Sequence, residues 1–232
     1  MMPSLPEGYR ALVFGASGAI GQALLQQLQS DPRCANVLGL SRQSLPSFDL
    51  RSETSIAACA QAVAAFGPFH VMLDATGALT LNERGPEKRL DELDADHLLN
   101  AFHLNAVGPS LLLKHFVPLL ASGERVIWGK LSARVGSIED NRKGGWYGYR
   151  AAKAALNMLL QTAAIEITRR RPLSVVAALQ PGTVLSALSQ PFVGDDALHP
   201  KDAAQRLLEV LDSLPATGRA QFVDHLGQHI PW

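Results

Sequence analysis

The chain has 232 residues, of which 47% are hydrophobic and 18% are charged, so it can form one sizeable core but is too short for two full domains. Twenty-one basic residues balance twenty-one acidic ones without a long run of either sign, which argues against a nucleic-acid partner or a strongly acidic one. No apolar run approaches the length of a membrane span, so we expect no membrane partner. The N-terminus lacks the features of a secretory signal, so we expect a cytoplasmic protein. Cys34 and Cys59 have no metal-ligand spacing, so we expect no bound metal.

Short apolar runs alternate with helical patterns along the whole chain. The pattern predicts the following strands and helices in chain order: strand 11–14, helix 19–29, strand 36–40, helix 52–66, strand 69–73, helix 94–120, strand 125–128, helix 146–168, strand 173–179, helix 200–214 and strand 221–223. The pair Gly108-Pro109 should bend or divide the helix over 94–120. Strict alternation implies parallel βαβ units, so we expect an α/β fold in a single domain over residues 1–232, with a doubly wound parallel sheet and helices on both faces.

A glycine-rich turn lies between the first predicted strand and the first predicted helix. It reads Gly15-Ala16-Ser17-Gly18-Ala19-Ile20-Gly21. Glycine permits the tight turn and the close approach of a phosphate to backbone amides, and the helix start favours an anion. Because strand, turn and helix follow in the required order, we expect a dinucleotide site here rather than a purely structural turn. Its candidate residues are Gly15, Ser17, Gly18, Ile20 and Gly21.

The end of the second predicted strand bears on the choice of nucleotide. It reads Gly39-Leu40-Ser41-Arg42 and carries no carboxylate. An acidic side chain would bind the ribose hydroxyls of NAD, whereas arginine attracts the additional phosphate of NADP. NADP is therefore favoured, with Ser41 and Arg42 as candidate ligands, although NAD is possible if Arg42 is merely a surface residue.

A short extended stretch after this strand contains Asp49-Leu50, which could contact the adenine. The Asp49 carboxylate could equally cap the helix that starts near Ser52.

Tyr149 and Lys153 are four residues apart, which places them on one face of the helix predicted over 146–168. A nearby ammonium favours the charged form of a phenol and so lowers its pKa. The spacing alone is weak, because a packed tyrosine beside a solvated lysine would show it too.

These segments together resemble the short-chain dehydrogenase/reductase family, whose members combine a Rossmann fold with a glycine-rich turn and a Tyr-x-x-x-Lys helix. Asp74-Ala75-Thr76-Gly77 resembles the family's Asn-Asn-Ala-Gly element, and Asn105 matches its helix-borne asparagine. Pro181-Gly182-Thr183-Val184-Leu185-Ser186 resembles the segment that meets the nicotinamide. Residues 132–138 and 146–149 are similar to bacterial members that resemble the C-factor signalling protein.

The resemblance implies a four-part catalytic site. Tyr149 would exchange a proton with the substrate oxygen, Lys153 would hold the nicotinamide ribose and lower the pKa of Tyr149, and Asn105 would support a water-linked proton path to Lys153. The serine that bonds the carbonyl is assigned to Ser132, although alignment through Gly136 can instead place Ala133 there and leave Ser137 as a substitute. The full set of residues that we expect to contact the nucleotide is Gly15, Ser17, Gly18, Ile20, Gly21, Ser41, Arg42, Asp49, Leu50, Ala75, Thr76, Gly77, Asn105, Tyr149, Lys153, Pro181, Gly182, Val184 and Ser186.

The apolar residues after Ser186 suggest a short substrate lid over residues 186–199. We therefore expect a small or moderately apolar carbonyl or alcohol as substrate, with carbonyl reduction as the working direction. A catalytically weak NAD(P)-binding protein with a signalling or redox-sensing role is the alternative, whereas an extended sugar-nucleotide enzyme would need more chain. The family resemblance implies a homodimer or homotetramer packed through the two long helices.

Overall fold

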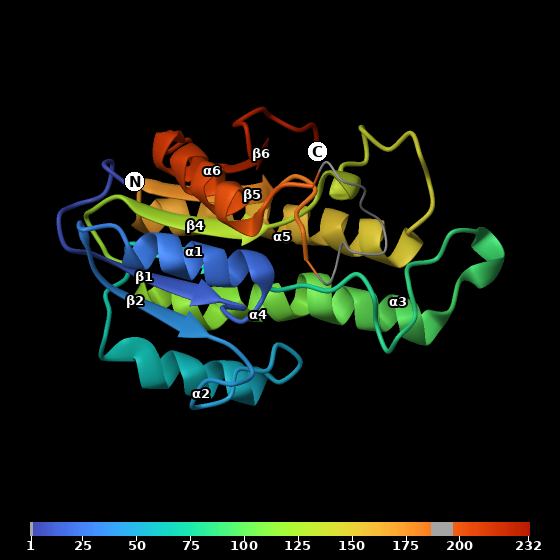
Figure 1. The fold of residues 1–232 in the computed structure, drawn as a ribbon, viewed down its shortest axis with the longest axis horizontal. Coiled ribbons are helices and arrows are strands. Elements are labelled where there is room, and N and C mark those ends of the chain that lie inside the picture. The colour runs from blue at the N-terminus through green and yellow to red at the C-terminus, as the bar shows by residue number, and fades with distance from the viewer. Residues whose placement is uncertain (1, 187–196) are drawn as a thin grey trace.

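The computed structural model describes residues 2–186 and 197–232, and its centre is a parallel sheet of six strands in the order β2-β1-β3-β4-β5-β6 (Figure 1). Every pair of neighbouring strands is parallel. The strands are β1 Tyr9–Phe14, β2 Cys34–Leu40, β3 Val71–Asp74, β4 Val126–Leu131, β5 Ser174–Gln180 and β6 Ala220–Asp224. The order reverses between β1 and β3, which is where ligands bind in open α/β sheets.

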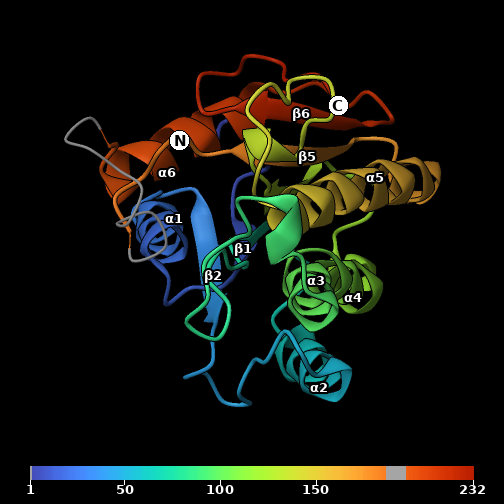
Figure 2. The ribbon, with the colours of Figure 1, turned by 90° about the vertical axis from the view of Figure 1, so that its right-hand side faces the viewer.

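Helices cover both faces of the sheet, as Figure 2 shows. One face carries α1 (Ala19–Gln29) and α6 (Pro200–Ser213), and the other carries α2 (Glu53–Ala64), α4 (Gly108–Phe116) and α5 (Tyr147–Arg170). Successive strand residues enter opposite cores: Leu12 and Phe14 of β1 pack against α2, α4 and α5, whereas Ala11 and Val13 pack against α1 and α6. The predicted doubly wound α/β fold is confirmed.

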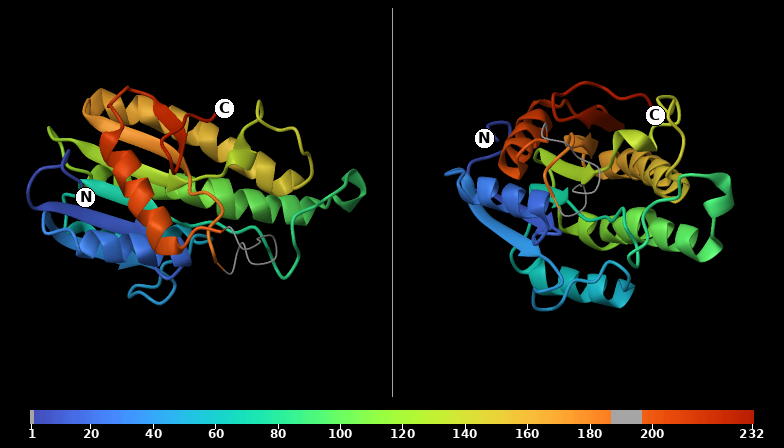
Figure 3. Two further views of the ribbon diagram at one scale, coloured as in Figure 1. Left: turned by 45° about the horizontal axis from the view of Figure 1, so that its top comes forward. Right: turned by 45° about the vertical axis from the view of Figure 1, so that its right-hand side comes forward.

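The helix predicted over 94–120 is divided into α3 (Ala95–Phe102), a π-helical turn at His103–Val107, and α4. Figure 3 shows these three pieces as one nearly continuous rod in green. The division precedes Gly108-Pro109, because Pro109 lies in the first turn of α4, where its missing amide hydrogen costs no helical bond. Asn105 lies in the π-helical turn, an irregularity that often marks functional sites.

The described residues also contain short 3-10 turns. They are Leu90–Glu92, Val117–Leu119 and Arg134–Gly136.

The substrate lid expected over residues 186–199 lies largely outside the described residues. Its flanks are joined by backbone hydrogen bonds from Leu185 N to Leu198 O and from Leu198 N to Thr183 O. In the described ranges, no helix has the length and apolar character needed to cross a membrane.

Candidate active site

Two adjoining cavities open beyond the carboxyl ends of the central strands. Their volumes are about 510 and about 700 Å³, and they share lining residues, so they form one cleft. The residues common to both are Ile20, Leu79, Ser132, Tyr149, Pro181 and Ser186. The smaller cavity, which we call the nucleotide cavity, adjoins the glycine-rich turn. The larger one, which we call the substrate cavity, lies between the loops after β4 and β5 and the start of α5.

The glycine-rich turn has the geometry expected of a phosphate site. Gly15 adopts a left-handed conformation with φ +75°, and a Cβ atom on Gly21 would lie only 2.1 Å from the Gly15 carbonyl oxygen. Gly21 therefore allows α1 to start directly against the turn. Gly18 is the N-cap of α1 and supplies no side-chain hydrogen bond, so the positive end of the helix remains available to an anion.

Arg42 lines the nucleotide cavity, and its guanidinium has no hydrogen bond or ion pair with any residue that the structure describes. The hydroxyl of Ser41, by contrast, bonds to Gln43 within the same loop. The Asp49 carboxylate accepts a hydrogen bond from Arg51 N at 2.9 Å, and Ser52 rather than Asp49 is the N-cap of α2. Of these three polar residues, Arg42 is therefore the one whose side chain is available to a ligand at the cavity.

Leu50 is buried and lies against Gly108. A Cβ atom on Gly108 would lie 2.5 Å from Leu50 Cγ and 2.8 Å from its carbonyl oxygen. Gly108 therefore allows the segment containing Leu50 to approach the start of α4 closely.

Gly77 lies close to both Asn105 and Lys153. A Cβ atom on Gly77 would lie 3.0 Å from Asn105 Oδ1 and 3.5 Å from Lys153 Nζ. The Asn105 amide is fully occupied: Oδ1 accepts from Ala78 N, and Nδ2 donates to Ala78 O and Ala101 O at 2.9 and 3.1 Å. The Asn105 side chain thus ties the turn after β3 to the end of α3, and its part in a proton path stays a prediction.

Tyr149 and Lys153 lie on adjacent turns of α5, and the Lys153 Nζ atom is 5.6 Å from the centroid of the Tyr149 ring. Lys153 is buried and donates a hydrogen bond to Leu131 O at 3.0 Å. Burial raises the pKa of Tyr149 to about 12, which is opposite to the lowering expected from Lys153.

The charge on Lys153 is itself disfavoured in this site. Burial first and the neighbouring Lys130 charge second hold the pKa of Lys153 well below its usual value, while Asp74 acts in the opposite direction. In the protein alone, therefore, burial determines the pKa of Tyr149 more than its neighbouring cation does.

The structure gives the hydroxyl of Ser132 a partner other than a substrate. Ser132 is 5% exposed, and its Oγ donates to Asn157 Oδ1 of α5 at 2.7 Å. The Ser137 hydroxyl accepts from Asp140 N and donates to Trp232 O. Ala133 lines the substrate cavity with Tyr149. The assignment of Ser132 to the carbonyl stays a prediction, and this hydrogen bond weighs against it.

A buried ion pair beneath the cleft was not predicted. Asp74 and Lys130 are register partners at the carboxyl ends of β3 and β4, and Lys130 Nζ lies 3.0 Å from Asp74 Oδ1. Lys130 also donates to the carbonyl oxygen of Thr76 at 2.6 Å. The pair therefore supports the turn where the family pattern has asparagines.

Most of the residues expected to contact a nucleotide come together in the cleft. The nucleotide cavity is lined by Gly18, Ile20, Gly21, Arg42, Ala75, Thr76, Gly77, Tyr149, Lys153, Pro181 and Ser186, and the substrate cavity adds Gly182 and Val184. The residues that line neither cavity are Gly15, Ser17, Ser41, Asp49, Leu50 and Asn105. Gly15 and Asn105 instead shape the turns that form the walls.

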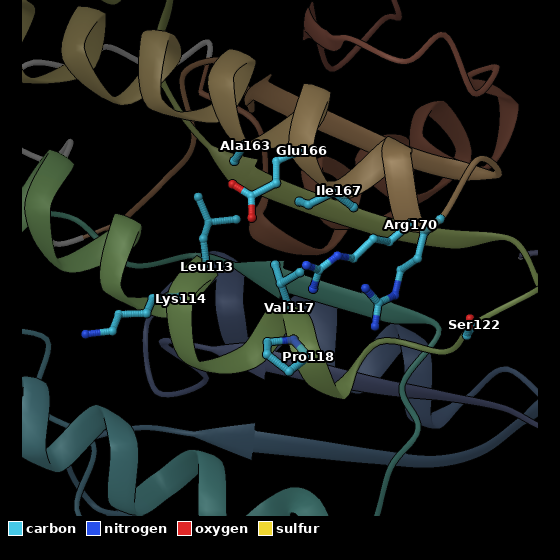
Figure 4. Close-up of a pocket in the computed structure, with 10 residues that line it drawn as sticks. Leu113, Lys114, Val117, Pro118, Ser122, Ala163, Glu166, Ile167 and Arg170 are labelled. Atoms are coloured by element: carbon cyan, nitrogen blue, oxygen red, sulfur yellow. The ribbon is translucent and has the colours of Figure 1, made fainter.

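A third cavity, of about 670 Å³, lies between α4 and α5 and away from the cleft (Figure 4). Leu113 and Val117 face Ala163 and Ile167 across it, and Arg170 reaches in from the end of α5. It contains none of the residues expected to act on a nucleotide or a carbonyl.

Comparison with known proteins gives matches over most of the chain. A family model described as enoyl-(acyl carrier protein) reductase matches residues 21–211. A 1-hydroxy-2-glutathionyl-2-methyl-3-butene dehydrogenase from Rhodococcus sp. (strain AD45) is 32% identical and covers 81% of this chain and 79% of its own. The C-signal protein of Myxococcus xanthus is 30% identical over 72% of this chain and 94% of its own. An NADPH-bound carbonyl reductase from chicken fatty liver superposes with a TM-score of 0.85 at 20% identity, covering 100% of this chain and 96% of that one, and so shares the fold.

Proposed function

The chain belongs to the short-chain dehydrogenase/reductase family of oxidoreductases, and on that premise we propose that it is an NADP-preferring enzyme that transfers hydride between the nicotinamide and a small or apolar carbonyl or alcohol. The observation that carries the proposal is that Tyr149 and Lys153 line a cleft that also contains the glycine-rich turn and the Pro181 segment. The Rhodococcus relative is named a dehydrogenase of a hydroxylated compound, which supports the alcohol and carbonyl class.

The chain's own groups fit a dinucleotide phosphate. The uncapped start of α1 favours a diphosphate, and Arg42, which is without an ion pair among the described residues, favours the additional phosphate of NADP. When bound, the nicotinamide supplies or accepts the hydride. Lys153 would hold its ribose, and the Pro181 and Gly182 backbone would face the ring.

Tyr149 would move the proton. Because burial keeps the phenol neutral at physiological pH, Tyr149 is in the form that can donate a proton to a carbonyl oxygen during reduction. Asn105 acts on this step indirectly, since its amide fixes the backbone of Ala78 beside the Gly77 turn. Trp146 adds an aromatic wall to the substrate cavity.

A second candidate is an NAD(P)-binding signalling or redox-sensing protein with little turnover. The observation in its favour is that Ala133 lines the substrate cavity, while the hydroxyl of Ser132 is bonded to Asn157. The C-signal relative is named for signalling, not for a reaction. A missing carbonyl donor lowers the rate of hydride transfer without preventing nucleotide binding.

We also propose that the chain forms a homodimer or homotetramer through α4 and α5. The groove between these helices is accompanied on α5 by exposed apolar side chains, among them Met158 and Ile165 at 66% and 42% exposure. Light scattering after size exclusion should give a multiple of the 24.9 kDa chain mass, and Ile165→Glu should reduce it. A monomeric wild-type protein would contradict this assembly.

The function is tested by nucleotide titration and a carbonyl panel. NADPH should bind more tightly than NADH, and Tyr149→Phe should abolish turnover while leaving NADPH affinity largely intact. Tyr147→Phe, two residues away on the same helix, is the matched control and should remain active. Turnover of Tyr149→Phe at the wild-type rate would refute the mechanism, and tight NADPH binding without turnover on any carbonyl would favour the sensing protein.

The preference for NADP is tested separately through Arg42. Arg42→Asp should move preference toward NADH, because it replaces a free cation at the nucleotide cavity with an anion. Arg219→Asp, on an exposed residue just before β6, makes the same charge change away from the cleft and should have no effect. An unchanged NADPH to NADH ratio in Arg42→Asp would assign the phosphate to another group.

A further inference from the structure

Glu87 is a buried carboxylate at the start of α5 that the mechanism above does not use. It belongs to the long connection between β3 and α3, and it is 2% exposed. Its Oε2 atom accepts a hydrogen bond from Gly148 N at 3.0 Å, and its backbone carbonyl oxygen accepts one from Trp146 N. One residue, remote in sequence, thus satisfies two backbone donors at the first turn of the helix that carries Tyr149.

The first turn of α5 lacks a cap of its own. Trp146, its N-cap, has a left-handed backbone with φ 54° and ψ 43° and makes no capping side-chain bond. A non-glycine residue in this conformation costs about 1 to 3 kcal/mol, so the surroundings must hold it there. Glu87 supplies the missing cap from outside the helix, and its negative charge suits the positive end of the helix dipole.

Close packing fixes the Glu87 side chain against α5. A Cβ atom on Gly148 would lie 3.0 Å from Glu87 Oε1 and 3.2 Å from Leu98 Cδ2, so a larger residue there would have to displace these side chains. The Oε1 atom has no hydrogen-bond partner within the described chain, and the His97 Nε2 atom lies 3.7 Å from it. A carboxylate buried with one oxygen unsatisfied is costly, which makes a plain stabilising role a poor explanation.

The turn that Glu87 holds forms part of the substrate cavity. The Trp146 and Tyr149 rings meet edge to face with their centroids 6.3 Å apart, and both line that cavity. A displacement of Trp146 would therefore change both the wall of the cavity and the position of the Tyr149 phenol.

We propose that Glu87 is a positioning residue of the reaction: by capping α5 from outside, it holds Trp146 in its left-handed conformation and so fixes where the Tyr149 phenol stands in the substrate cavity. The inference rests on the proposed function only for its kinetic consequence. The structural consequence, namely that Glu87 determines the environment of Tyr149, does not depend on which reaction the cleft carries out.

Three substitutions separate the roles of the Glu87 side chain. Glu87→Ala removes the side-chain bond to Gly148 N and leaves only the backbone bond to Trp146 N. Glu87→Gln keeps an acceptor for Gly148 N without the charge, and Glu87→Asp keeps the charge but is too short to reach. Ser52→Ala is the control, because it removes the side-chain cap of α2, which is remote from the cleft.

Relative to wild type, Glu87→Ala and Glu87→Asp should lower kcat by about 10- to 100-fold with little change in NADPH affinity, as expected for a displaced catalytic group. Glu87→Gln should stay within about threefold of wild type, since the hydrogen bond survives. Ser52→Ala should lose stability but no turnover. Should Glu87→Ala fail to fold, Glu87→Asp decides the question. Wild-type kcat in a folded Glu87→Asp or Glu87→Ala variant would overturn the proposal.

A second measurement needs no turnover and separates this inference from the proposed function. The Tyr149 phenol titrates in the free protein, and its ultraviolet phenolate absorbance should show a lower pKa in Glu87→Asp than in wild type, because the displaced ring becomes better solvated. Trp146 fluorescence should change in the same variant. If the Tyr149 absorbance and the Trp146 fluorescence both change but no carbonyl is turned over, the proposed function fails and the Glu87 inference stands. If neither of these two signals changes, the Glu87 inference fails.

Discussion

The Lys130 ammonium lies 3.0 Å from the Asp74 carboxylate, and each side chain is only 1% exposed. The two residues face each other across β3 and β4, and Asp74 Oδ1 also accepts hydrogen bonds from the amide and hydroxyl of Thr76. The other oxygen, Oδ2, has no partner within the described residues. The turn that carries Gly77 is therefore supported by a buried ion pair, in which each charge is compensated by the other.

Removing one member of this pair should be far more damaging than removing both. Lys130→Met leaves a buried carboxylate unpaired and should lower the free energy of unfolding by about 3 to 5 kcal/mol in urea denaturation. The double variant Asp74→Asn/Lys130→Met should recover most of this loss, because the asparagine oxygen can still accept from Thr76. Arg89→Met removes one member of the exposed Arg89–Asp91 pair and should cost less than about 1 kcal/mol. Equal losses of unfolding free energy in Lys130→Met and Arg89→Met would show that the buried pair contributes no more than an exposed one.

Periodicity was sufficient to predict the fold. The helix expected over 19–29 is α1 as observed, and each predicted strand overlaps an observed one, because buried parallel strands and amphipathic helices have distinct apolar patterns. The turn glycines could also be assigned, because they lie between a predicted strand and a predicted helix. In the structure, a Cβ atom on Gly21 would lie 2.1 Å from the Gly15 carbonyl oxygen. These features depend on neighbours that are close in sequence.

The polar supports of the site could not be predicted, because they depend on contacts between distant segments. Glu87 is 61 residues from Gly148, and nothing in its surrounding sequence indicates that it caps α5. The Asp74–Lys130 pair had a usable signal, namely two charged residues at the ends of predicted strands that adjoin in the sheet. Asn105 was identified through the family pattern, but its amide partners depend on the π-helical turn.

The ionisation of Tyr149 can be measured in the free protein. Burial raises its pKa from an ordinary value near 10 to about 12, so the phenolate should appear only as the pH rises toward about 12. Ultraviolet titration of wild type minus Tyr149→Phe isolates this group, with Tyr147→Phe as control. A transition near 10 or below in the difference would show that Lys153, not burial, controls the phenol.

The pKa of Tyr149 also determines how the rates of reduction and oxidation change with pH. Reduction uses the neutral phenol as an acid, so its rate should hold up to the pKa of Tyr149 in the working complex and fall above it. Alcohol oxidation uses the phenolate as a base and should rise with pH over the same interval. Initial rates in both directions across alkaline pH give the measurement, and parallel pH profiles would exclude Tyr149 as the shared group.

The position of the carbonyl donor is decided by a pair of serine and alanine substitutions. Ala133→Ser places a hydroxyl in the substrate cavity and should raise kcat on simple ketones by about 10-fold or more. Ser132→Ala should leave kcat within about twofold of wild type. It should lower the free energy of unfolding by about 1 to 3 kcal/mol, because Asn157 loses its bond and its Nδ2 atom already lacks a partner in the described chain. A loss of turnover in Ser132→Ala as severe as in Tyr149→Phe would instead identify Ser132 as the carbonyl donor.

Gly21 and Gly18 offer a matched pair for the phosphate turn. A Cβ atom on Gly21 would lie 2.1 Å from the Gly15 carbonyl oxygen, whereas one on Gly18 would lie 3.4 Å from the same atom, an ordinary contact. Gly21→Ala must therefore push α1 away from the turn, and we expect it to weaken NADPH binding by at least about 10-fold and to cost about 1 to 3 kcal/mol of stability. Gly18→Ala keeps an extended backbone at φ −78° that alanine adopts freely, so its stability should change by less than about 1 kcal/mol.

Calorimetric titration with NADPH and thermal unfolding of both variants make the comparison. Equal effects of the two substitutions would mean that the close contact between Gly21 and Gly15 does not determine nucleotide binding.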